Sequence, residues 1–474
     1  MSDPVVYQVY PRSFQDSDGD GFGDLAGVIA RLEHLEWLGV DALWLSPFYP
    51  SPGADSGYDV ADYTAVDPAY GTLDDFDRLV EACHTRGIEV LVDLVAAHTS
   101  IEHPWFREHP DRYVWADGER PPNNWAAAFG GPAWSRDPES GRWYLHSFYP
   151  EQPDLDWRNP EVGRAISAAI GFWRERGVDG FRLDAIERAM KDRELRDDPP
   201  ASGPPALPAP EQAARLDPVH SRNDPEISLV LSALREAAGE ARLVGEVYLP
   251  SAGLGPYLEH LDHAFAFEFL HSPWEAERLR AVIAEASAVG GIAWVLSNHD
   301  FPRLATRLGP DAVRGAAILL LTLPGPAFVY QGDEIGMADG AEAEPPVDRF
   351  GRDRHRHPMQ WDPSPSGGFS AGEPWLAPTD PEARNVADQR ADPDSILNLY
   401  RELIALRAEL DGPVEMLDAG PEVVAYRRGD HAIAVNLGPE PAPVPGAGEV
   451  LIGADELANG RKIPPNAGCV TREV

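Results

Sequence analysis

The chain alternates between short, almost wholly apolar runs and longer segments in which apolar residues recur every three or four positions. Apolar runs without polar alternation are typical of strands in a parallel sheet that is covered on both faces. The longer segments have the spacing of helices that bury one face. Eight runs predict strands: Val5–Tyr10, Ala42–Ser46, Val90–Val95, Gly180–Ala185, Leu243–Val247, Ala264–Phe269, Ala293–Ser297 and Ala327–Tyr330. The predicted helices include Leu25–Leu38, Thr72–Arg86, Pro160–Arg176 and Glu226–Ala238.

Strand–helix alternation repeated eight times predicts an α/β fold, a closed (β/α)8 TIM barrel rather than an open sheet. From Ala97 to about Asn159 the chain is rich in Trp, Pro, Gly, Asn and His, and it is too long for a strand–helix loop. An inserted subdomain is therefore expected after strand 3. Long loops also follow strand 4 (Asp192–Pro225) and strand 8 (Gly332–Asp392), where a barrel builds its active site.

The end of the chain has a different pattern. After a predicted helix near Ser395–Arg407, short alternating pieces at Val423–Arg427, His431–Asn436 and Gly448–Ile452 predict a small C-terminal antiparallel β-domain. The expected domains are a barrel at 1–97 and 160–408, an inserted subdomain at 98–159 and a C-terminal β-domain at 409–474.

Charge and cysteine content narrow the possible partners. The net charge of −38 disfavours nucleic acids, anionic membranes and anionic substrates, and leaves neutral or cationic small molecules. Two cysteines, Cys83 and Cys469, cannot form a disulfide framework, and no Cys/His spacing suggests zinc. The start has no basic region or cleavage site and no apolar run could span a bilayer, so a soluble cytoplasmic protein is expected. The oligomeric state stays open.

Polar residues gather at the ends of the predicted strands, where a barrel carries its catalytic groups. Several carboxylates with an arginine and two histidines at one mouth require a chemical explanation rather than a single structural ion pair. These residues are Asp93 and His98 at strand 3, Arg182 and Asp184 at strand 4, Glu246 at strand 5, and His299 and Asp300 at strand 7.

Glycoside hydrolysis explains this set of groups. It needs one ionised carboxylate and one carboxylic acid beside the scissile bond, roughly 5–5.5 Å apart in retaining enzymes. Asp184 and Glu246 end neighbouring strands and could meet that spacing. Arg182, two residues before Asp184, would keep it ionised, whereas crowding by Asp184 and Asp300 would keep Glu246 protonated.

An acidic loop near the start of the chain is a candidate metal site. Carboxylates alternate with glycines from Asp16 to Asp24, as in the first half of an EF-hand loop. Gly27 stands where an EF-hand has its bidentate glutamate, so the loop is not an EF-hand. A structural divalent cation and a solvated acidic turn are both consistent with these residues alone.

Four strand-end stretches resemble the signature regions of glycoside hydrolase family 13, the α-amylase family. They read DLVAAH (Asp93–His98), GFRLD (Gly180–Asp184), GEV (Gly245–Val247) and SNHD (Ser297–Asp300). The resemblance covers nearly the whole chain and is closest to the α-glucosidase and oligo-1,6-glucosidase branch. The features of that branch are QPDLDW (Gln152–Trp157), GYDVADY (Gly57–Tyr63) and RHPMQWD (Arg356–Asp362).

The resemblance implies roles for individual residues. Asp184 would be the nucleophile, Glu246 the acid/base and Asp300 the transition-state stabiliser. An Asp59–Arg356 pair would close the pocket at the non-reducing end and enforce exo-cleavage. The residues implied to grip the terminal glucose are Asp59, His98, Arg182, His299 and Arg356. Those implied to shape the pocket are Tyr58, Phe129, Phe148, Gln152 and Arg352. Any one of Tyr58, Phe129 and Phe148, taken alone, is better explained as an ordinary core packing residue.

Two further implications concern metal and linkage. The α-amylases hold calcium with an Asn that is Ala97 here, so that site is not expected. The oligo-glucosidase branch binds Ca2+ in a loop like the acidic one; Mg2+ is an alternative and no organic cofactor is expected. The implied ligands are Asp16, Asp18, Asp20, Asp24 and the Phe22 carbonyl. Enzymes of the branch that prefer α-1,6 bonds usually have Val after the nucleophile, where this chain has Ala185.

The function expected is retaining, exo-acting hydrolysis of terminal α-1,4-linked glucose from short oligosaccharides such as maltose. Oligo-1,6-glucosidase is one alternative, and a transglucosidase or trehalose synthase-like isomerase is another, since all share a covalent glucosyl intermediate. A non-catalytic binding subunit belongs to a different class, and the presence of Asp184, Glu246 and Asp300 argues against it.

Overall fold

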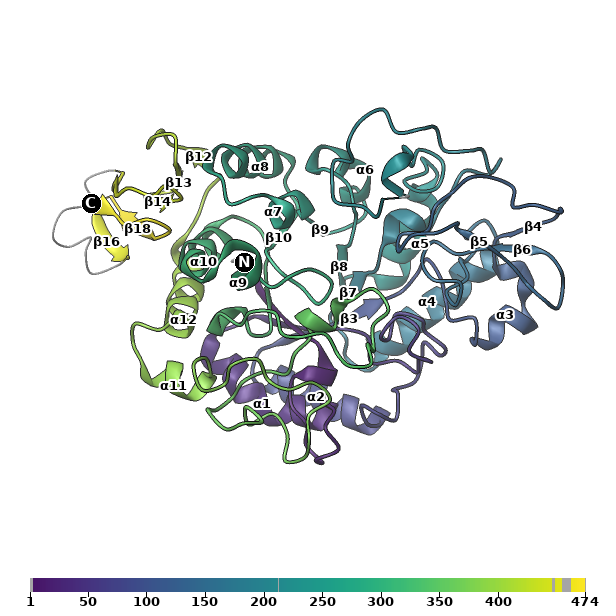
Figure 1. The fold of residues 1–474 in the computed structure, drawn as a ribbon, viewed down its shortest axis with the longest axis horizontal. Coiled ribbons are helices and arrows are strands. Elements are labelled where there is room, and N and C mark those ends of the chain that lie inside the picture. Colours follow the sequence, from purple (N-terminus) through teal and green to yellow (C-terminus); the bar gives the residue numbers. More distant parts are fainter. Residues whose placement is uncertain (1–2, 212, 446–447, 454–461, 474) are drawn as a thin grey trace. The chain divides into compact units, whose positions relative to one another are not determined.

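The computed structural model describes residues 3–211, 213–445, 448–453 and 462–473. Eight parallel strands form a closed barrel in the order β1-β11-β10-β9-β8-β7-β3-β2 (Figure 1), which confirms the predicted (β/α)8 fold. The barrel strands are β1 (Val5–Val9), β2 (Ala42–Leu45), β3 (Glu89–Leu94), β7 (Gly180–Leu183), β8 (Arg242–Gly245), β9 (His263–Phe265), β10 (Ile292–Val295) and β11 (Ala327–Tyr330).

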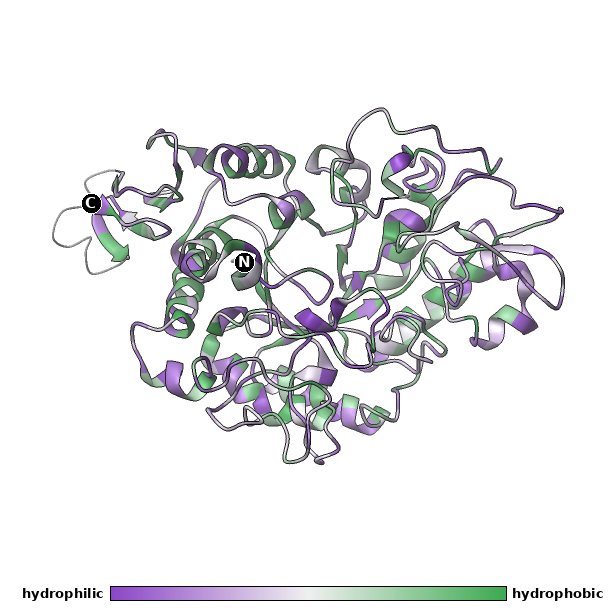
Figure 2. Cartoon of the chain, in the orientation of Figure 1, coloured by the Kyte–Doolittle hydropathy of each residue, from purple (hydrophilic) through white to green (hydrophobic). Residues whose placement is uncertain are grey.

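Helix α1 (Leu25–Leu38) has its predicted bounds because both of its ends carry local signals. Asp24 accepts a hydrogen bond from the Gly27 amide at 2.6 Å, which satisfies a free donor of the first turn. Gly39 has φ 87° and ends the helix in the left-handed region that glycine adopts without strain. Other helices are α2 (Leu73–Thr85), α4 (Pro160–Glu175), α5 (Ile227–Ala238), α8 (Ala276–Val289), α10 (Val313–Thr322) and α12 (Ile396–Leu406). Figure 2 shows hydrophobic and hydrophilic residues along these helices, as burial of one face requires.

The predicted strand Ala264–Phe269 is wrong beyond Phe265. Strand β9 ends there, and helix α7 (Phe267–His271) begins two residues later. The residues of α7 are buried on almost every side, so the stretch is apolar whatever its backbone conformation. A continuous apolar run does not distinguish a buried strand from a buried helix, which is why the pattern failed here.

A small antiparallel sheet lies between β3 and α4 along the chain, where the sequence predicts an inserted subdomain. Its order is β4-β6-β5, and Trp125, Trp134 and Leu145 are buried in its core. The strands are β4 (Trp115–Ala116), β5 (Trp134–Arg136) and β6 (Trp143–Leu145), preceded by α3 (Pro104–Glu108). The predicted domain boundaries at 98 and 159 stay predictions.

The C-terminal region forms the expected antiparallel sheet, in the order β12-β13-β14-β18-β16. Two buried arginines connect it with the last turn of α10. Arg407 Nη1 donates to Leu321 O at 2.7 Å, and Arg428 Nη1 donates to Thr322 O at 3.0 Å, so carbonyls that lack a helical partner are satisfied. The strands are β12 (Glu415–Met416), β13 (Val423–Arg428), β14 (His431–Asn436), β16 (Glu449–Ile452) and β18 (Gly468–Arg472).

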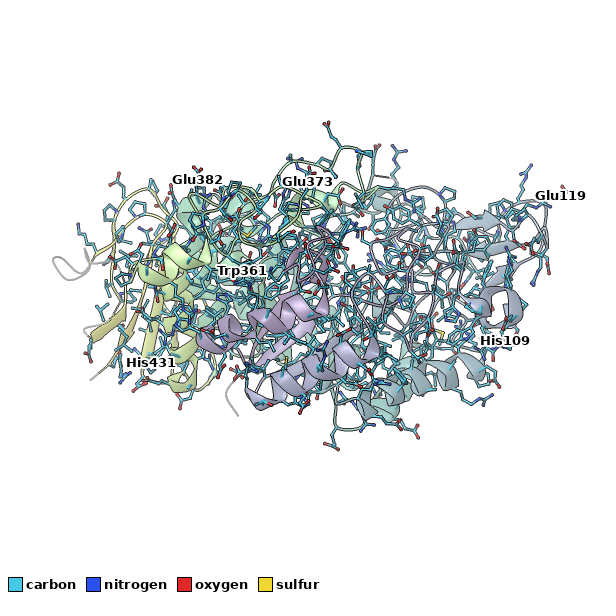
Figure 3. All side chains as sticks on the ribbon, turned by 90° about the horizontal axis from the view of Figure 1, so that it is seen from below. His109, Glu119, Trp361, Glu373, Glu382 and His431 are labelled. Carbon is cyan, nitrogen blue, oxygen red and sulfur yellow. The ribbon has the colours of Figure 1, made fainter. Side chains whose placement is uncertain are left out.

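The chain divides into two compact units, each built from separate stretches of the sequence. The first unit contains 1–43, 82–88 and 266–474, and the second contains 44–81 and 89–265. In the first unit, Trp361 (Figure 3) packs edge-on against Phe14 and donates through Nε1 to Phe14 O at 2.9 Å. This motif tryptophan is therefore part of the core. No helix among the described residues is long and apolar enough to cross a membrane.

Candidate active site

The second unit holds one group of predicted site residues, on the neighbouring strands β3, β7 and β8. The parallel register places Asp93 beside Arg182, and Arg182 beside Val244, two residues before Glu246. Side chains at equivalent positions of adjacent strands point to the same face. The charged groups at the ends of these three strands therefore meet, as the sequence predicts for Arg182, Asp184 and Glu246.

Arg182 is buried, and its guanidinium donates to three carboxylates. Nη1 contacts Asp93 Oδ1 at 2.5 Å and Asp184 Oδ1 at 2.7 Å, and Nη2 contacts Glu246 Oε2 at 2.6 Å. The sequence predicts a contact of Arg182 with Asp184 alone, whereas in the structure Arg182 also contacts Asp93 and Glu246. One positive charge thus faces three acidic groups, an arrangement in which a proton is readily held by one of them.

Asp93 is the carboxylate of this group that is completely buried. Burial raises the pKa of Asp93 to about 6, against the lowering effect of the Arg182 charge. Trp44 Nε1 also donates to Asp93 Oδ2 at 2.9 Å. The sequence places Asp93 at a strand end but predicts no role for it. Its contact with Arg182 depends on strand register, which the local pattern does not reveal.

The turn after Asp184 connects the two proposed catalytic carboxylates. Ala185 has φ 37°, in the left-handed region, and its amide donates to Glu246 Oε2 at 2.9 Å. The amide of Ile186 donates to the backbone oxygen of Glu246 at 3.1 Å. The position of Glu246 is therefore set by backbone donors of the nucleophile loop as well as by Arg182.

His98, Gln152 and Asp55 form a buried chain of polar contacts. His98 Nε2 lies 3.1 Å from Tyr58 O and 3.0 Å from Gln152 Nε2, which donates to Asp55 Oδ2 at 2.9 Å. Burial lowers the pKa of His98 to about 4, so its ring is neutral at neutral pH. The ring of Phe148 lies 5.1 Å from that of His98 and 5.5 Å from that of Phe129. These predicted pocket residues are therefore linked by a continuous series of pairwise contacts.

Asp59, the residue directly after Tyr58, is buried in the second unit. Its carboxylate accepts from Ser51 Oγ at 2.7 Å and from the amides of Ala54 and Asp55 at 2.9 and 3.0 Å. Burial raises the pKa of Asp59. Asp59 belongs to the second unit and Arg356 to the first, and the predicted pair between them stays a prediction.

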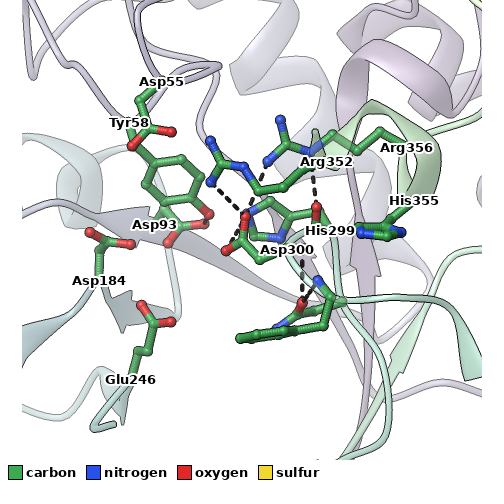
Figure 4. Close-up of polar contacts among 12 residues, drawn as sticks. Asp55, Tyr58, Asp93, Asp184, Glu246, His299, Asp300, Arg352, His355 and Arg356 are labelled. Atoms are coloured by element: carbon green, nitrogen blue, oxygen red, sulfur yellow. Dashed lines mark hydrogen bonds and ion pairs between the residues drawn. The ribbon is translucent and has the colours of Figure 1, made fainter. Parts of the chain in front are cut away.

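The first unit holds the other predicted group, drawn with its polar contacts in Figure 4. Asp300 Oδ1 accepts from Arg352 Nη1 at 2.9 Å and from Arg356 Nη2 at 3.1 Å. Arg356 Nε also donates to His299 O at 2.9 Å. Two guanidiniums therefore bind the Asp300 carboxylate. Asp348, which the sequence did not single out, contacts Arg352 Nη2 at 2.6 Å and keeps that arginine in place.

The acidic loop lies in the first unit. Carboxylate oxygens of Asp16, Asp18 and Asp24 lie within 4.8 Å of one another, a spacing that one hard cation can bridge. Asp20 is outside this group, and its Oδ1 accepts from the Phe22 amide at 2.8 Å. The residues fit a cation with oxygen ligands through three of the four predicted carboxylates.

The sequence reasoning also missed a buried ion pair in the second unit. Lys191 and Asp154 form an ion pair, and neither side chain is more than 4% exposed. Asp154 belongs to the QPDLDW motif and also accepts from the Ser147 amide at 2.9 Å. The only sign of this ion pair in the sequence is a lysine seven residues after Asp184. A lysine in a loop is ordinarily solvated, so the sequence does not predict its burial.

Comparison with known proteins decides the family. The profile described as "Alpha amylase, catalytic domain" matches residues 8–412, and that of "Domain of unknown function (DUF3459)" matches residues 407–470. The chain belongs to the α-amylase family. This result confirms the resemblance seen in the strand-end motifs and makes the chain a glycoside hydrolase of family 13.

Relatives within the α-amylase family include several named glucosidases. The chain is 40% identical to a probable alpha-glucosidase of Rhizobium meliloti, over 90% of this chain and 86% of that protein. It is 35% identical to an oligo-1,6-glucosidase of Parageobacillus thermoglucosidasius, over 90% and 87%. Among solved structures, the alpha-glucosyl transfer enzyme XgtA aligns with a TM-score of 0.92 and 37% identity over 99% of both chains. The trehalulose synthase MutB from Pseudomonas mesoacidophila MX-45 aligns with a TM-score of 0.88 and 30% identity over 99% and 98%.

Proposed function

We propose that this α-amylase-family chain is a retaining α-glucosidase that releases terminal glucose from short α-1,4-linked oligosaccharides. The observation that carries the proposal is the sharing of Arg182 by Asp184 and Glu246, at 2.7 and 2.6 Å. Carboxyl groups held by the two terminal nitrogens of one guanidinium are close together. This supports the retaining spacing of roughly 5–5.5 Å over the wider spacing, about 6.5–9.5 Å, of inverting enzymes.

In the first step, Asp184 attacks the anomeric carbon of the glucose while the glycosidic C–O bond breaks. Glu246 gives its proton to the leaving oxygen, so the free sugar departs neutral. In the second step, Glu246 takes a proton from water, the water oxygen bonds to the anomeric carbon, and Asp184 is released. Two inversions at one carbon retain the α-configuration.

The chain's other polar groups have supporting roles in this proposal. Arg182 keeps Asp184 ionised for attack, because its guanidinium contacts the carboxylate directly. His98 stays uncharged and can donate a hydrogen bond to a sugar hydroxyl without adding charge to the site. The SNHD motif assigns Asp300 to stabilise the transition state, and Arg352 and Arg356 keep Asp300 ionised.

A divalent cation, Ca2+ first and Mg2+ as the alternative, is proposed for the acidic loop in a structural role. Asp16, Asp18 and Asp24 would hold it, with Asp20 and the Phe22 carbonyl as further ligands implied by the motif. A bound cation would neutralise part of the loop's negative charge and hold the loop at the start of α1, and it takes no part in the reaction.

The decisive experiment follows the configuration of the first glucose released from maltose by NMR. We expect the α-anomer; release of β-glucose would rule out the retaining mechanism. Parallel incubations with isomaltose, sucrose and trehalose would establish linkage preference.

A second function, glucosyl transfer or substrate isomerisation, is favoured by one observation. The chain aligns over nearly its whole length with a solved alpha-glucosyl transfer enzyme and with a trehalulose synthase. The same covalent intermediate serves all of these reactions, and the acceptor that attacks it differs. Hydrolysis releases two glucose molecules per maltose, whereas each transfer releases one glucose and forms one longer oligosaccharide. At high maltose concentration, transfer products in a ratio to free glucose that approaches one would therefore establish this function in place of hydrolysis.

A further inference from the structure

Strand β1 carries a side-chain amide in an otherwise mostly apolar sequence. All five residues of Val5–Val9 are buried, and Gln8 is only 1% exposed. The ring of Tyr7 meets that of His34 in α1 edge-on, so the alternation of a strand turns the next side chain, Gln8, towards the barrel interior. A buried amide is costly unless it has hydrogen-bond partners. The position of Gln8 therefore indicates a specific polar contact inside the barrel.

That contact is with the histidine of the SNHD motif. Gln8 Nε2 lies 2.8 Å from His299 Nδ1, and His299 is completely buried. His299 lies four residues after β10, and both β10 and β1 pair with β11. The hydrogen bond thus passes across β11 on the inner face of the barrel, between residues that are 291 positions apart in the chain.

The chemistry of the two groups fixes the direction of this hydrogen bond. The amide nitrogen of a glutamine can only donate, so His299 Nδ1 accepts and the proton of an uncharged ring lies on Nε2. Nε2 lies 3.4 Å from Asp300 Oδ2 (Figure 4). A protonated Nε2 faces this carboxylate favourably, whereas a Gln8 amide turned the other way would direct the bare lone pair of Nε2 at it. The surroundings of Asp300 therefore favour the same orientation of the Gln8 amide.

Asp300 presents its two carboxylate oxygens to different donors. Oδ1 accepts from Arg352 Nη1 at 2.9 Å and from Arg356 Nη2 at 3.1 Å, while Oδ2 faces His299 Nε2. With the proton on Nε2, each oxygen faces an N–H donor, and the orientation of the carboxylate is fixed from both sides. The tautomer of His299 therefore affects the residue that is proposed to stabilise the transition state.

The residue that follows β1 fixes the plane of the His299 ring. Tyr10 lies two residues after Gln8 in extended backbone, and its ring stacks on that of His299 with centroids 5.9 Å apart and an interplanar angle of 16°. The guanidinium of Arg356 lies 5.3 Å from the centroid of the Tyr10 ring. The stacked imidazole thus keeps one nitrogen towards Gln8 and the other towards Asp300.

We propose that Gln8 is a positioning residue that fixes the tautomer of His299, so that Nε2–H is directed at Asp300 and at the glucose bound beside it. Gln8 does not touch the substrate and acts only through His299. Its effect on catalysis rests on the proposed glucosidase function, because a hydrogen bond from Nε2 to a sugar hydroxyl strengthens as charge develops in the transition state. The tautomer itself is a property of the folded chain and depends on no substrate.

The first test reads the tautomer by NMR. In protein labelled with 15N-histidine, the chemical shift of each ring nitrogen distinguishes a protonated nitrogen from a bare one. His299→Gln identifies the signals of His299 among those of the 14 histidines. In the wild type we expect Nε2 to be protonated and Nδ1 to be bare. In Gln8→Met the Nδ1 signal should move, because its hydrogen bond is lost.

The second test measures the effect of this contact on catalysis. Gln8→Met keeps the length of the side chain without the donor, and it should lower kcat/KM for maltose about ten-fold, as expected for the loss of one hydrogen bond. Gln360→Met is the matched control, because Gln360 is also completely buried but donates to Arg384 O, at 2.6 Å, and kcat/KM should stay close to that of the wild type. In a His299→Ala background, Gln8→Met should cause no further loss with a nitrophenyl α-glucoside.

Each outcome decides one question. A proton on His299 Nδ1 in the wild type would overturn the proposal, and this result is available even if Gln8→Met does not fold. An unchanged kcat/KM in Gln8→Met, or the same loss with and without His299, would show that Gln8 is only a packing residue. A wild type that has the expected tautomer but hydrolyses no α-glucoside would refute the proposed glucosidase function and leave the contact between Gln8 and His299 intact.

Discussion

Arg182 donates through its terminal nitrogens to Asp93, Asp184 and Glu246, and it is itself buried. A buried guanidinium with three acidic partners cannot be replaced without leaving those carboxylates close together and uncompensated. Its fixed charge also lets neighbouring acidic groups have different protonation states. The chemistry proposed for Asp184 and Glu246 depends on that difference.

The first prediction concerns the pH dependence of stability through Asp93. Its folded pKa of about 6 is above the ordinary value of 3.8, so the folded protein binds this proton more tightly than the unfolded chain. The resulting stabilisation is complete below the unfolded pKa and is lost as pH rises towards 6. Lowering the pH from about 7 to about 5 should therefore raise the free energy of unfolding of the wild type by about 1 kcal/mol more than that of Asp93→Asn. Denaturant unfolding of both proteins at both pH values measures this difference in the free energy of unfolding. A difference between wild type and variant that stays constant, or that grows in favour of the wild type as the pH rises, would contradict the prediction.

The second prediction separates the two catalytic carboxylates. Asp184→Asn should abolish turnover of maltose and of aryl α-glucosides alike, because no covalent intermediate can form. Glu246→Gln should slow maltose by about 10²–10⁴-fold but slow a nitrophenyl α-glucoside much less in its first step, since that leaving group needs no proton. Circular dichroism checks that both variants fold. Equal loss on both substrates in Glu246→Gln would refute its role as the acid.

The third prediction concerns linkage preference at Ala185. We expect the wild type to have a higher kcat/KM for maltose than for isomaltose, and Ala185→Val to shift the ratio towards isomaltose by a factor that corresponds to about 1–3 kcal/mol at most. Because Ala185 has φ 37°, a β-branched residue should also lower the free energy of unfolding, by about 1–2 kcal/mol. Ala185→Gly is the control that relieves the backbone without adding bulk. Faster cleavage of isomaltose by the wild type would favour oligo-1,6-glucosidase.

At the scale of elements, the acidic loop connects β1 to α1 and also supplies the helix cap. Asp24 bonds the Gly27 amide through Oδ1 and the Ser17 amide through Oδ2, and Asp16 accepts from Ser370 Oγ at 2.5 Å. A cation held here would therefore stabilise the start of α1 and the segment near Ser370 together.

The fourth prediction tests that cation. Excess chelator should lower the Tm of the wild type, and Ca2+ should restore it, because a ligand that binds only the folded form stabilises it. Asp18→Asn should have a lower Tm that no longer responds to chelator, while Asp62→Asn, outside the loop, should respond as the wild type does. Asp20→Asn would show whether the fourth predicted carboxylate contributes. A wild-type Tm unaffected by chelator, with no metal by elemental analysis, would refute the site.

At the scale of the whole molecule, the charge of −38 makes the folded chain repel itself. The fifth prediction is that Tm rises when NaCl is increased to about 0.5 M, because the Debye length falls well below 10 Å and screens this repulsion. Sucrose at equal osmolality is the control for preferential exclusion. The rise should disappear near the pI of about 4.6, where the net charge vanishes. A Tm that falls with NaCl at neutral pH would contradict the prediction.

The sequence by itself determined the barrel and gave the candidate catalytic residues as predictions. Strands covered on both faces are apolar along most of their length, so the runs Val90–Val95, Gly180–Ala185 and Leu243–Val247 are visible as strands. The bounds of α1 were predictable because Asp24 and Gly39 are local signals that act within one turn. Motif spacing then placed the acidic residues at strand ends.

Only the tertiary structure decided which groups share a partner. Asp93 meets Arg182 through the register of β3 on β7, a pairing between residues 89 positions apart that no local periodicity encodes. The left-handed turn at Ala185, whose amide donates to Glu246 Oε2, likewise depends on how loops pack. Local patterns report which side of an element is buried, whereas the identity of the neighbour is set by long-range packing of the folded chain.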